Sequence, residues 1–483
     1  MKKIKILFLS LIAFGFVSCD IDDFGDLNVN PNATTTPQAS YLLSNALTSL
    51  PGVISSSQGQ LYVQYLANSQ YTSSDNYQTV RFSYNGWYLG PLADLDLVMK
   101  LNSEEETMIE AQVYGSNANQ IAVAKILTSF YYLHVTDRWG DIPYSEALQS
   151  DEAHFLPKFD SQEAVYNSIF DELKAANAMM DGGAGPEGDF LFSGDMDKWK
   201  TFANTIRLVA ALRLSKVAAD KGKTEFVAAM NDGVVTTNAE NIFYQHLADA
   251  NNQNPWYGAF LTRSDYAVSN TLIDYMQSAE NGGMMDVVMD PRLPVFANGT
   301  ESSQYSEYVG MTYGVSEAVA GSISNSDVSF LGSAFRGQDT PTYIYTAAQV
   351  LFSMAEAAQL GWIDGSAEDY YYQAIQASLE QYGVGDSYDT FISNSEVAFD
   401  ADKALELIGN QKWVALFLNG YEAWTEWRRT GYPALQPAAA ALNESGEIPV
   451  RQGYPTTERD NNSENYSVVE SADNLDTPVW WDK

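Results

Sequence analysis

The chain has 483 residues, of which 45% are hydrophobic, with 62 Asp and Glu against 26 Lys and Arg and a formal net charge of −36. This length and apolar content suffice for a large core, so most of the chain is not intrinsically disordered. One Cys and three scattered His exclude a disulfide scaffold and the usual zinc, haem and iron–sulfur sites, and the negative charge disfavours binding to nucleic acid.

The N-terminal segment predicts export and lipidation. Three lysines precede an apolar run over residues 6–17, which as a helix spans roughly 18 Å, well short of the roughly 30 Å of a bilayer core. Residues 1–18 therefore predict a signal peptide rather than a membrane span. Ser18 directly precedes Cys19, the only Cys, in a pattern that resembles a bacterial lipobox, in which this Cys is diacylated and becomes the first residue. An ordinary signal peptide with an incidental Cys is the alternative.

Residues 19–38 predict a tether between the lipid and a folded body. Four aspartates crowd directly behind Cys19, and an Asn- and Pro-rich stretch follows them, a composition too polar and turn-rich to pack. No later stretch has the apolar length of a membrane span. We therefore expect a single exported domain over residues 39–483.

The folded body is predicted to be mainly helical. Residues 120–135 are apolar on most sides, which is typical of a helix buried between others. Asp160 and Glu163 fit a capping box that begins the next helix. A third helix is predicted over residues 197–219, with Arg207, Arg213 and Lys216 off its apolar stripe. Short strands are predicted only near residues 234–237 and 448–451.

Residues 347–360 and 371–383 predict a closely packed helical pair. Small residues at their facing positions have the spacing of a tetratricopeptide unit, and a generic helical hairpin is the alternative. Between the predicted helices lie long polar, Tyr-rich segments, and unstructured connections of such length are usually functional. The predicted loop insertions are residues 181–195, 245–265, 298–340 and 383–398, with a further polar stretch over residues 68–86.

The sequence gives little support for catalysis. Sixty-two acidic residues guarantee paired carboxylates by chance, and the separation that glycoside hydrolysis requires is not visible in a sequence. No nucleophile elbow, zinc-protease motif, P-loop or dinucleotide fingerprint occurs. His134 ends an apolar helix and is predicted to be a core or cap residue. We expect no cofactor, although the acidic loops offer oxygen ligands for a structural Ca²⁺.

Clustered aromatic residues give a better indication of binding. Eight of the 27 residues between Tyr62 and Tyr88 are aromatic, and they alternate with amides and lack helical periodicity. Aromatic rings flanked by amides suit the apolar faces and hydroxyl rims of sugars, and they also suit a peptide. Packing of the loops against the helices is the alternative. The predicted ligand-binding residues are Tyr71, Asn76, Tyr77, Tyr84, Trp87, Trp256, Tyr257 and Tyr313.

Several motifs occur in order along the chain. They are DRWGDIPYSEAL at 137–148, GDMDKWKTFAN at 194–204, DPRL at 290–293, KWVALFLNGYEAW at 412–424, IPVR at 448–451, YP at 454–455 and WWDK at 480–483. Pro, Gly and Trp in these motifs lie beside predicted helices or on their apolar stripes, so we expect the motifs to belong to the scaffold rather than to contact a ligand. Taken together and in order, the motifs resemble those of the SusD/RagB family of nutrient-binding lipoproteins, and more closely its second SusD-like subfamily.

This resemblance implies a mainly α fold in which four tetratricopeptide-like helical pairs back an irregular, loop-rich lobe. It also implies a lipoprotein on the outer face of the outer membrane, acting as the lid of a SusC-like TonB-dependent transporter. The ligand, an oligosaccharide or a peptide, would be delivered unaltered. A surface glycoside hydrolase with paired carboxylates and a purely structural docking module are the alternatives. The contact residues of the founding starch binder cannot be transferred to this chain.

Overall fold

The computed structural model describes residues 37–149, 155–302 and 307–483, and Ala39–Lys483 form one compact unit. The predicted signal peptide, Cys19 and the tether up to residue 36 lie outside the described residues. Within those residues, no helix combines the length and the apolar character that a membrane span needs.

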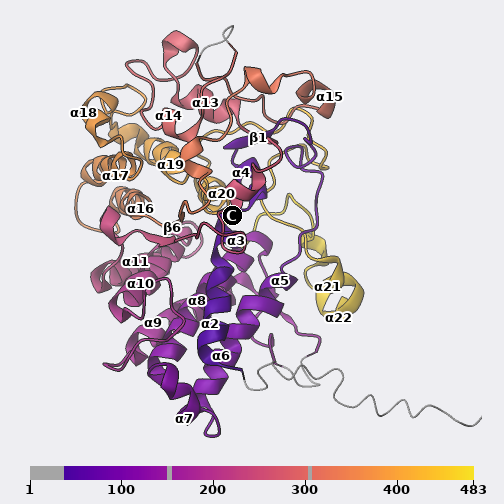
Figure 1. The fold of residues 1–483 in the computed structure, drawn as a ribbon, viewed down its shortest axis with the longest axis vertical. Helices are drawn as coiled ribbons and strands as arrows, with labels where there is room; N and C mark the ends of the chain where they lie inside the picture. The colour runs from indigo at the N-terminus through magenta and orange to yellow at the C-terminus, as the bar shows by residue number, and fades with distance from the viewer. Residues whose placement is uncertain (1–36, 150–154, 303–306) are drawn as a thin grey trace, which may run out of the picture. The chain divides into compact units, whose positions relative to one another are not determined.

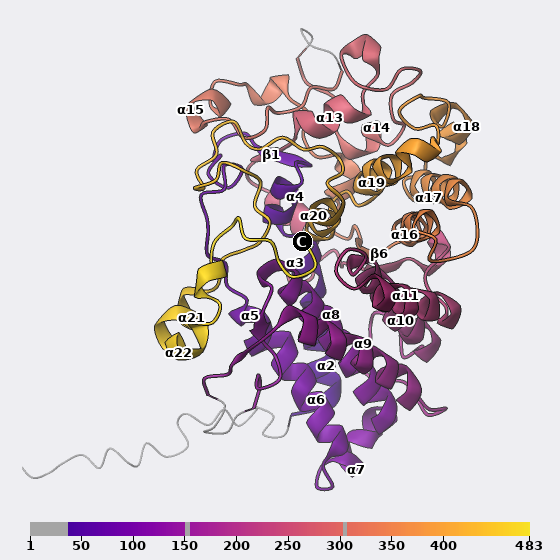
Figure 2. The same cartoon turned by 180° about the vertical axis from the view of Figure 1, so that it is seen from behind.

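Pairs of consecutive helices form the scaffold, which confirms the mainly α prediction. In Figures 1 and 2 the first three pairs follow one another along one side of the unit. The paired helices in the described residues are α8 (Asn117–Trp139) with α9 (Gln162–Met179), α10 (Met196–Arg213) with α11 (Ala219–Asp232), α16 (Ala347–Gln359) with α17 (Ala367–Gln381), and α19 (Ala404–Ala415) with α20 (Gly420–Thr430).

Shorter elements complete the fold. In both views α13, α14, α15 and β1 lie in the upper part, and α21 and α22 lie on the side away from α10. The helices are α2 (Ala39–Thr48), α3 (Leu50–Ile54), α4 (Ser57–Tyr62), α5 (Asn85–Trp87), α6 (Ala93–Ser103), α7 (Met108–Ala111), α12 (Pro255–Ala259), α13 (Asn270–Met276), α14 (Leu293–Phe296), α15 (Glu317–Ala320), α18 (Tyr388–Phe391), α21 (Thr456–Asn461) and α22 (Ser463–Tyr466).

The strands form antiparallel pairs, and both predicted strand positions were wrong. Residues 234–237 and 448–451 are irregular, because their amides bond elsewhere: the Val235 N–H donates to Thr205 Oγ1 at 3.2 Å, and the Val450 N–H donates to the Leu475 carbonyl at 2.8 Å. The observed pairs are β1 (Leu66–Asn68) with β5 (Tyr266–Val268), β2 (Ile142–Pro143) with β3 (Phe159–Asp160), and β4 (Ile242–Tyr244) with β6 (Thr342–Tyr345).

Two helix boundaries differ from the prediction. The third predicted helix ends at Arg213, and α11 then folds back on it. A Cβ at Gly222 would lie 2.7 Å from the Ala211 carbonyl oxygen, so only Gly allows this approach. Helix α9 is capped by Ser161, whose hydroxyl accepts from the Ala164 N–H, whereas Asp160 accepts from the amide and hydroxyl of Ser145.

Two of the three cations that were predicted to lie off the stripe of α10 are buried. The Arg213 side chain is 1% exposed and pairs with Asp137 and, at 2.6 Å, with Glu422. Arg207 pairs with Glu225 at 2.6 Å, and only Lys216 is exposed. Buried carboxylates on neighbouring helices thus make these positions part of the core.

The 290–293 motif is structural, as expected. Arg292 of the 290–293 motif is fully buried and pairs with Asp290 at 2.6 Å. Its guanidinium also donates to Ser378 of α17 and Gln411 of α19. The motif therefore ties α14 to the helical pairs.

Candidate functional site

A polar cleft of about 260 Å³ lies among the predicted loops 245–265 and 298–340. Hydroxyl and amide groups form part of its lining together with one carboxylate and one guanidinium, and Phe330 contributes an apolar wall. Backbone hydrogen bonds fix this wall, because the Asn298 N–H donates to the Phe330 carbonyl at 2.9 Å. The polar lining residues are Ser264, Asn298, Glu301, Asn325, Ser326 and Arg336.

Arg336 supplies the free donors of the cleft. Its guanidinium carbon lies 4.9 Å from the centre of the Phe260 ring, and this contact orients the planar group. Among the described residues it forms no ion pair, and its buried Nε has no hydrogen-bond partner. Burial lowers the pKa of Arg336 from its ordinary value, but an Arg side chain stays charged at neutral pH. The cleft therefore offers several unused N–H donors beside a partly exposed ring.

Tyr71 presents a second ring beside the cleft. Its side chain is 52% exposed, and the Arg263 guanidinium lies 5.2 Å from its ring centre. The Ser69 hydroxyl donates to the carbonyl of the cleft residue Ser264 at 3.1 Å, and the Ser69 amide donates to the Asp265 carbonyl at 2.8 Å. The 68–77 loop is thus attached directly to one wall of the cleft.

Trp256 and Tyr257 lie on the short helix α12. Asn254 caps this helix by accepting from the Trp256 amide at 2.7 Å, and its side-chain amide donates to the Thr340 carbonyl at 2.9 Å. Trp256 is buried with its ring 5.7 Å from that of Tyr266, whereas Tyr257 remains partly exposed. This helix therefore joins the two long loops.

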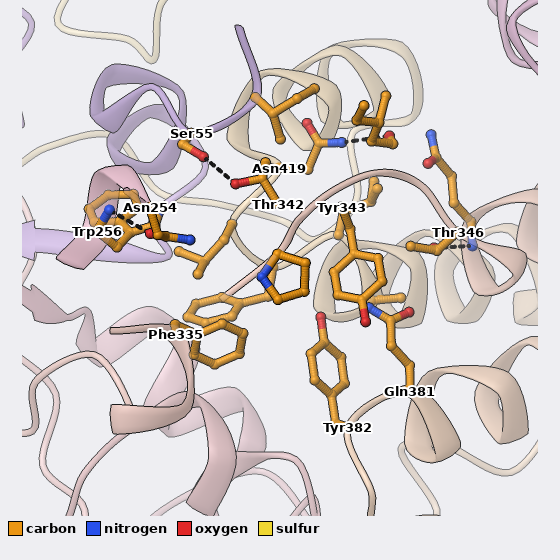
Figure 3. Close-up of a pocket in the computed structure, with 18 residues that line it drawn as sticks. Ser55, Asn254, Trp256, Phe335, Thr342, Tyr343, Thr346, Gln381, Tyr382 and Asn419 are labelled. Carbon is orange, nitrogen blue, oxygen red and sulfur yellow. Dashed lines mark hydrogen bonds between the residues drawn. The ribbon is translucent and has the colours of Figure 1, made fainter. Parts of the chain in front are cut away.

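An aromatic cavity lies behind the same loops (Figure 3). Trp256, Phe335, Tyr343 and Tyr382 are among its lining residues, and Figure 3 shows the phenol ends of the two tyrosines turned toward each other. Its volume of about 60 Å³ is room for about two water molecules.

Three of the predicted ligand-binding residues meet in a buried network instead. Tyr77 is 1% and Tyr313 is 7% exposed, and their hydroxyls are 3.4 Å apart. The Tyr77 hydroxyl accepts from the Ala438 amide at 3.1 Å, and Asn76 donates to the Val315 carbonyl at 2.9 Å. These side chains bind distant loops together and present no face to a ligand in this structure.

Tyr84 and Trp87 also pack internally. The Tyr84 ring contacts Trp139 edge-on at 5.2 Å, and its hydroxyl donates to Glu458 at 3.0 Å. The partly buried Trp87 lies under the Arg138 guanidinium, 4.6 Å from its ring centre. These rings, Trp256 and the buried network pack against other parts of the protein, but Trp256 also lines the aromatic cavity and Tyr84 lines a cavity of about 200 Å³. Ligand contact stays a prediction, and Tyr71 and Tyr257 are the predicted residues with exposed or partly exposed rings outside these packed groups.

Asp75 is a buried acid at the base of the 68–77 loop. It is 1% exposed and accepts from the Asn68 amide at 2.8 Å and from the Asn68 side chain. Burial raises the pKa of Asp75 from 3.8 to about 7, and the hydrogen bonds from Asn68 only partly offset this rise.

This shift predicts a loss of stability as pH rises. In the folded state Asp75 keeps its proton up to about pH 7, whereas in the unfolded chain it loses it near pH 3.8, so the folded state binds more protons between these values. Three pKa units correspond to at most roughly 4 kcal/mol. We expect urea denaturation between pH 4 and 8 to show a steeper decline for the wild type than for Asp75→Asn. Asp482, whose pKa burial raises to about 6, is common to both proteins, and parallel declines would contradict the assignment.

The described residues contain no group of three or more His, Cys, Asp and Glu side chains able to hold a metal ion. The acidic loop residues considered as Ca²⁺ ligands therefore do not gather into such a group there. His134 is buried, its ring 4.5 Å from that of Phe130, and burial lowers its pKa. It is a core residue, as predicted.

Arg336, Arg263 and the cleft amides were not predicted from the sequence. The available signal was the Phe335-Arg336 pair, a cation within an amide- and aromatic-rich loop of a chain that has few cations.

Comparison with known proteins agrees with this architecture. A SusD-like family, described as starch-binding and associating with the outer membrane, matches residues 31–455. No curated protein sequence matches the chain.

Solved structures match over nearly the whole chain. A chitin-binding protein is 27% identical, with a TM-score of 0.77 over 92% of this chain and 100% of its own. A structure from Bacteroides vulgatus, described as that of an outer-membrane protein involved in nutrient binding, is 24% identical, with a TM-score of 0.78 over 92% and 100%. A chitin-binding SusD homologue of Flavobacterium johnsoniae is 24% identical, with a TM-score of 0.75 over 92% and 98%.

Proposed function

Because the chain belongs to the SusD-like family of outer-membrane nutrient-binding proteins, we propose that it captures a neutral oligosaccharide at the cell surface and passes it unaltered to a transporter. The family binds its ligands and is not catalytic, so the glycoside hydrolase alternative is set aside.

The observation that carries the proposal is the polar cleft with rings beside it. Tyr71 and Phe260 leave part of their rings exposed, and rings of this kind can stack on the apolar faces of a sugar. Arg336 and the cleft amides can bind hydroxyl groups or an acetamido carbonyl. With a net charge of −36, the protein favours a neutral chain over an acidic one.

We propose oligomers of N-acetylglucosamine as the first ligand class to examine. A relative that is 27% identical over nearly the whole chain is described as chitin-binding. The acetamido oxygen of each sugar would accept from a donor such as Arg336, whose buried Nε has no hydrogen-bond partner among the described residues. A peptide could use the same rings and amides and is the competing ligand class.

For delivery, we propose that a diacyl anchor on Cys19 holds the protein at the outer face of the outer membrane. There it would act as the lid of a SusC-like TonB-dependent transporter. The family association with the outer membrane and the lipobox-like sequence before Cys19 support this arrangement.

Tyr71→Ala and Arg336→Met test the proposed site. We expect each change to weaken binding of a hexamer of N-acetylglucosamine about tenfold in calorimetry, because a stacked ring or a charged hydrogen bond contributes about 1–2 kcal/mol. Met keeps an apolar side chain beside Phe260 and removes the donors together with the charge. The matched control is Tyr41→Ala, since Tyr41 is 66% exposed on helix α2, outside the cleft. Unchanged affinity in both site variants would contradict the proposal that the cleft binds the oligosaccharide.

A further inference from the structure

A second and larger cavity lies outside the candidate site. It has a volume of about 440 Å³ and lies where the 181–195 loop, the start of α10 and strand β4 meet. Two rings on its walls face solvent, with Phe190 45% and Phe243 39% exposed. This volume lies in the range of small-molecule sites.

Some polar groups of this cavity are already bonded within the protein, and others are not. Asp195 caps α10, and Glu240 accepts from the amides of Thr236 and Thr237. The Lys198 ammonium and the Asp197 carboxylate form no ion pair among the described residues. A donor and an acceptor thus remain available beside the two exposed rings.

The walls of the cavity are held in place from behind. The Phe190 ring contacts Tyr244 edge-on at 5.5 Å. Asp189, which is 6% exposed, accepts from the amides of Phe192 and Gly194 and, at 2.8 Å, from the indole of Trp199. A loop fixed in this way keeps its rings oriented before a ligand arrives, which lowers the entropic cost of binding.

A paired strand connects this cavity to the candidate site. Phe243 of β4 lies directly opposite Tyr343 of β6, and the two ring centres are 5.7 Å apart. Tyr343 and Phe335 line the aromatic cavity, and Arg336, the next residue, lines the polar cleft. The larger cavity, the aromatic cavity and the polar cleft therefore follow one another along the loops, and Figure 1 shows β6 between the α10–α11 pair and the upper part of the unit.

We propose that the Phe190–Phe243 cavity is a second carbohydrate site, which binds further sugar residues of the neutral oligosaccharide held at the polar cleft. This inference rests on the proposed function. Two linked contacts on one ligand act as a bivalent pair, so the second raises affinity through its effective concentration. Only oligosaccharides long enough to reach both sites gain this affinity.

The test compares oligomers of two to eight N-acetylglucosamine residues in calorimetry. For the wild type we expect affinity to rise at least tenfold from the shortest bound chain to the longest. A variant with Phe190→Ala and Phe243→Ala should bind the short chain as the wild type does and lose this rise. Its unchanged short-chain affinity also reports an intact fold. The matched control carries Leu89→Ala and Ile109→Ala, two residues that are 83% and 78% exposed elsewhere.

The failures of the two proposals are distinguishable. A double variant that keeps the full rise would overturn the second site, and so would a wild type that binds short and long chains equally. A wild type that binds no oligomer of the series would overturn the proposed ligand class, and the second site with it.

Discussion

Replacing Arg213 with Met is expected to lower the free energy of unfolding by about 3–5 kcal/mol. The change leaves the carboxylates of Asp137 and Glu422 buried without their ion-pair partner, with side chains 4% and 2% exposed. Both acids also hold other elements, since Asp137 accepts from the Trp481 indole at 2.9 Å and Glu422 accepts from Gln349 at 3.0 Å. Urea denaturation followed by tryptophan fluorescence measures the loss.

The matched control for this prediction is Lys100→Met. Lys100 pairs with Asp96 at 2.7 Å, but its side chain is 47% exposed, and exposed pairs contribute about 0–1 kcal/mol. If Arg213→Met proved no more damaging than Lys100→Met, the buried network would not be a main support of the fold.

Replacing Cys19 with Ala is expected to move the protein from the membrane fraction to the soluble fraction. Two acyl chains provide stable anchoring, and Ala has no thiol that could carry them. Fractionation of cells, followed by detergent phase partition, measures the change. Ser18→Ala keeps a small residue before the Cys and should leave the protein anchored. Retention of Cys19→Ala in the membrane fraction would contradict lipid anchoring.

Helix positions were predictable from the sequence, but some boundaries and burial were not. The apolar pattern of residues 120–135 and the small residues of 347–360 are local signals, and α8 and α16 follow them. The end of α10 at Arg213 depends on how closely α11 packs through Gly222. The burial of Arg213 depends on acids that lie 76 and 209 residues away in sequence. No local periodicity reports such partners.

The candidate site, like the helices, was predictable from the sequence only in part. The sequence predicted that the long loops carry function, and loops 245–265 and 298–340 do line the polar cleft. It could not separate exposed rings from buried ones, because Tyr71 and Tyr77 lie in the same polar stretch. Only the distant amide of Ala438, which donates to the Tyr77 hydroxyl, distinguishes the two.

The most direct test of the central claim is to titrate the protein with a hexamer of N-acetylglucosamine and then recover the sugar for mass spectrometry. We predict saturable binding, with every recovered chain still a hexamer after prolonged incubation. Shortened chains with new reducing ends would contradict a capture protein, and a flat titration would contradict a chitin-type ligand.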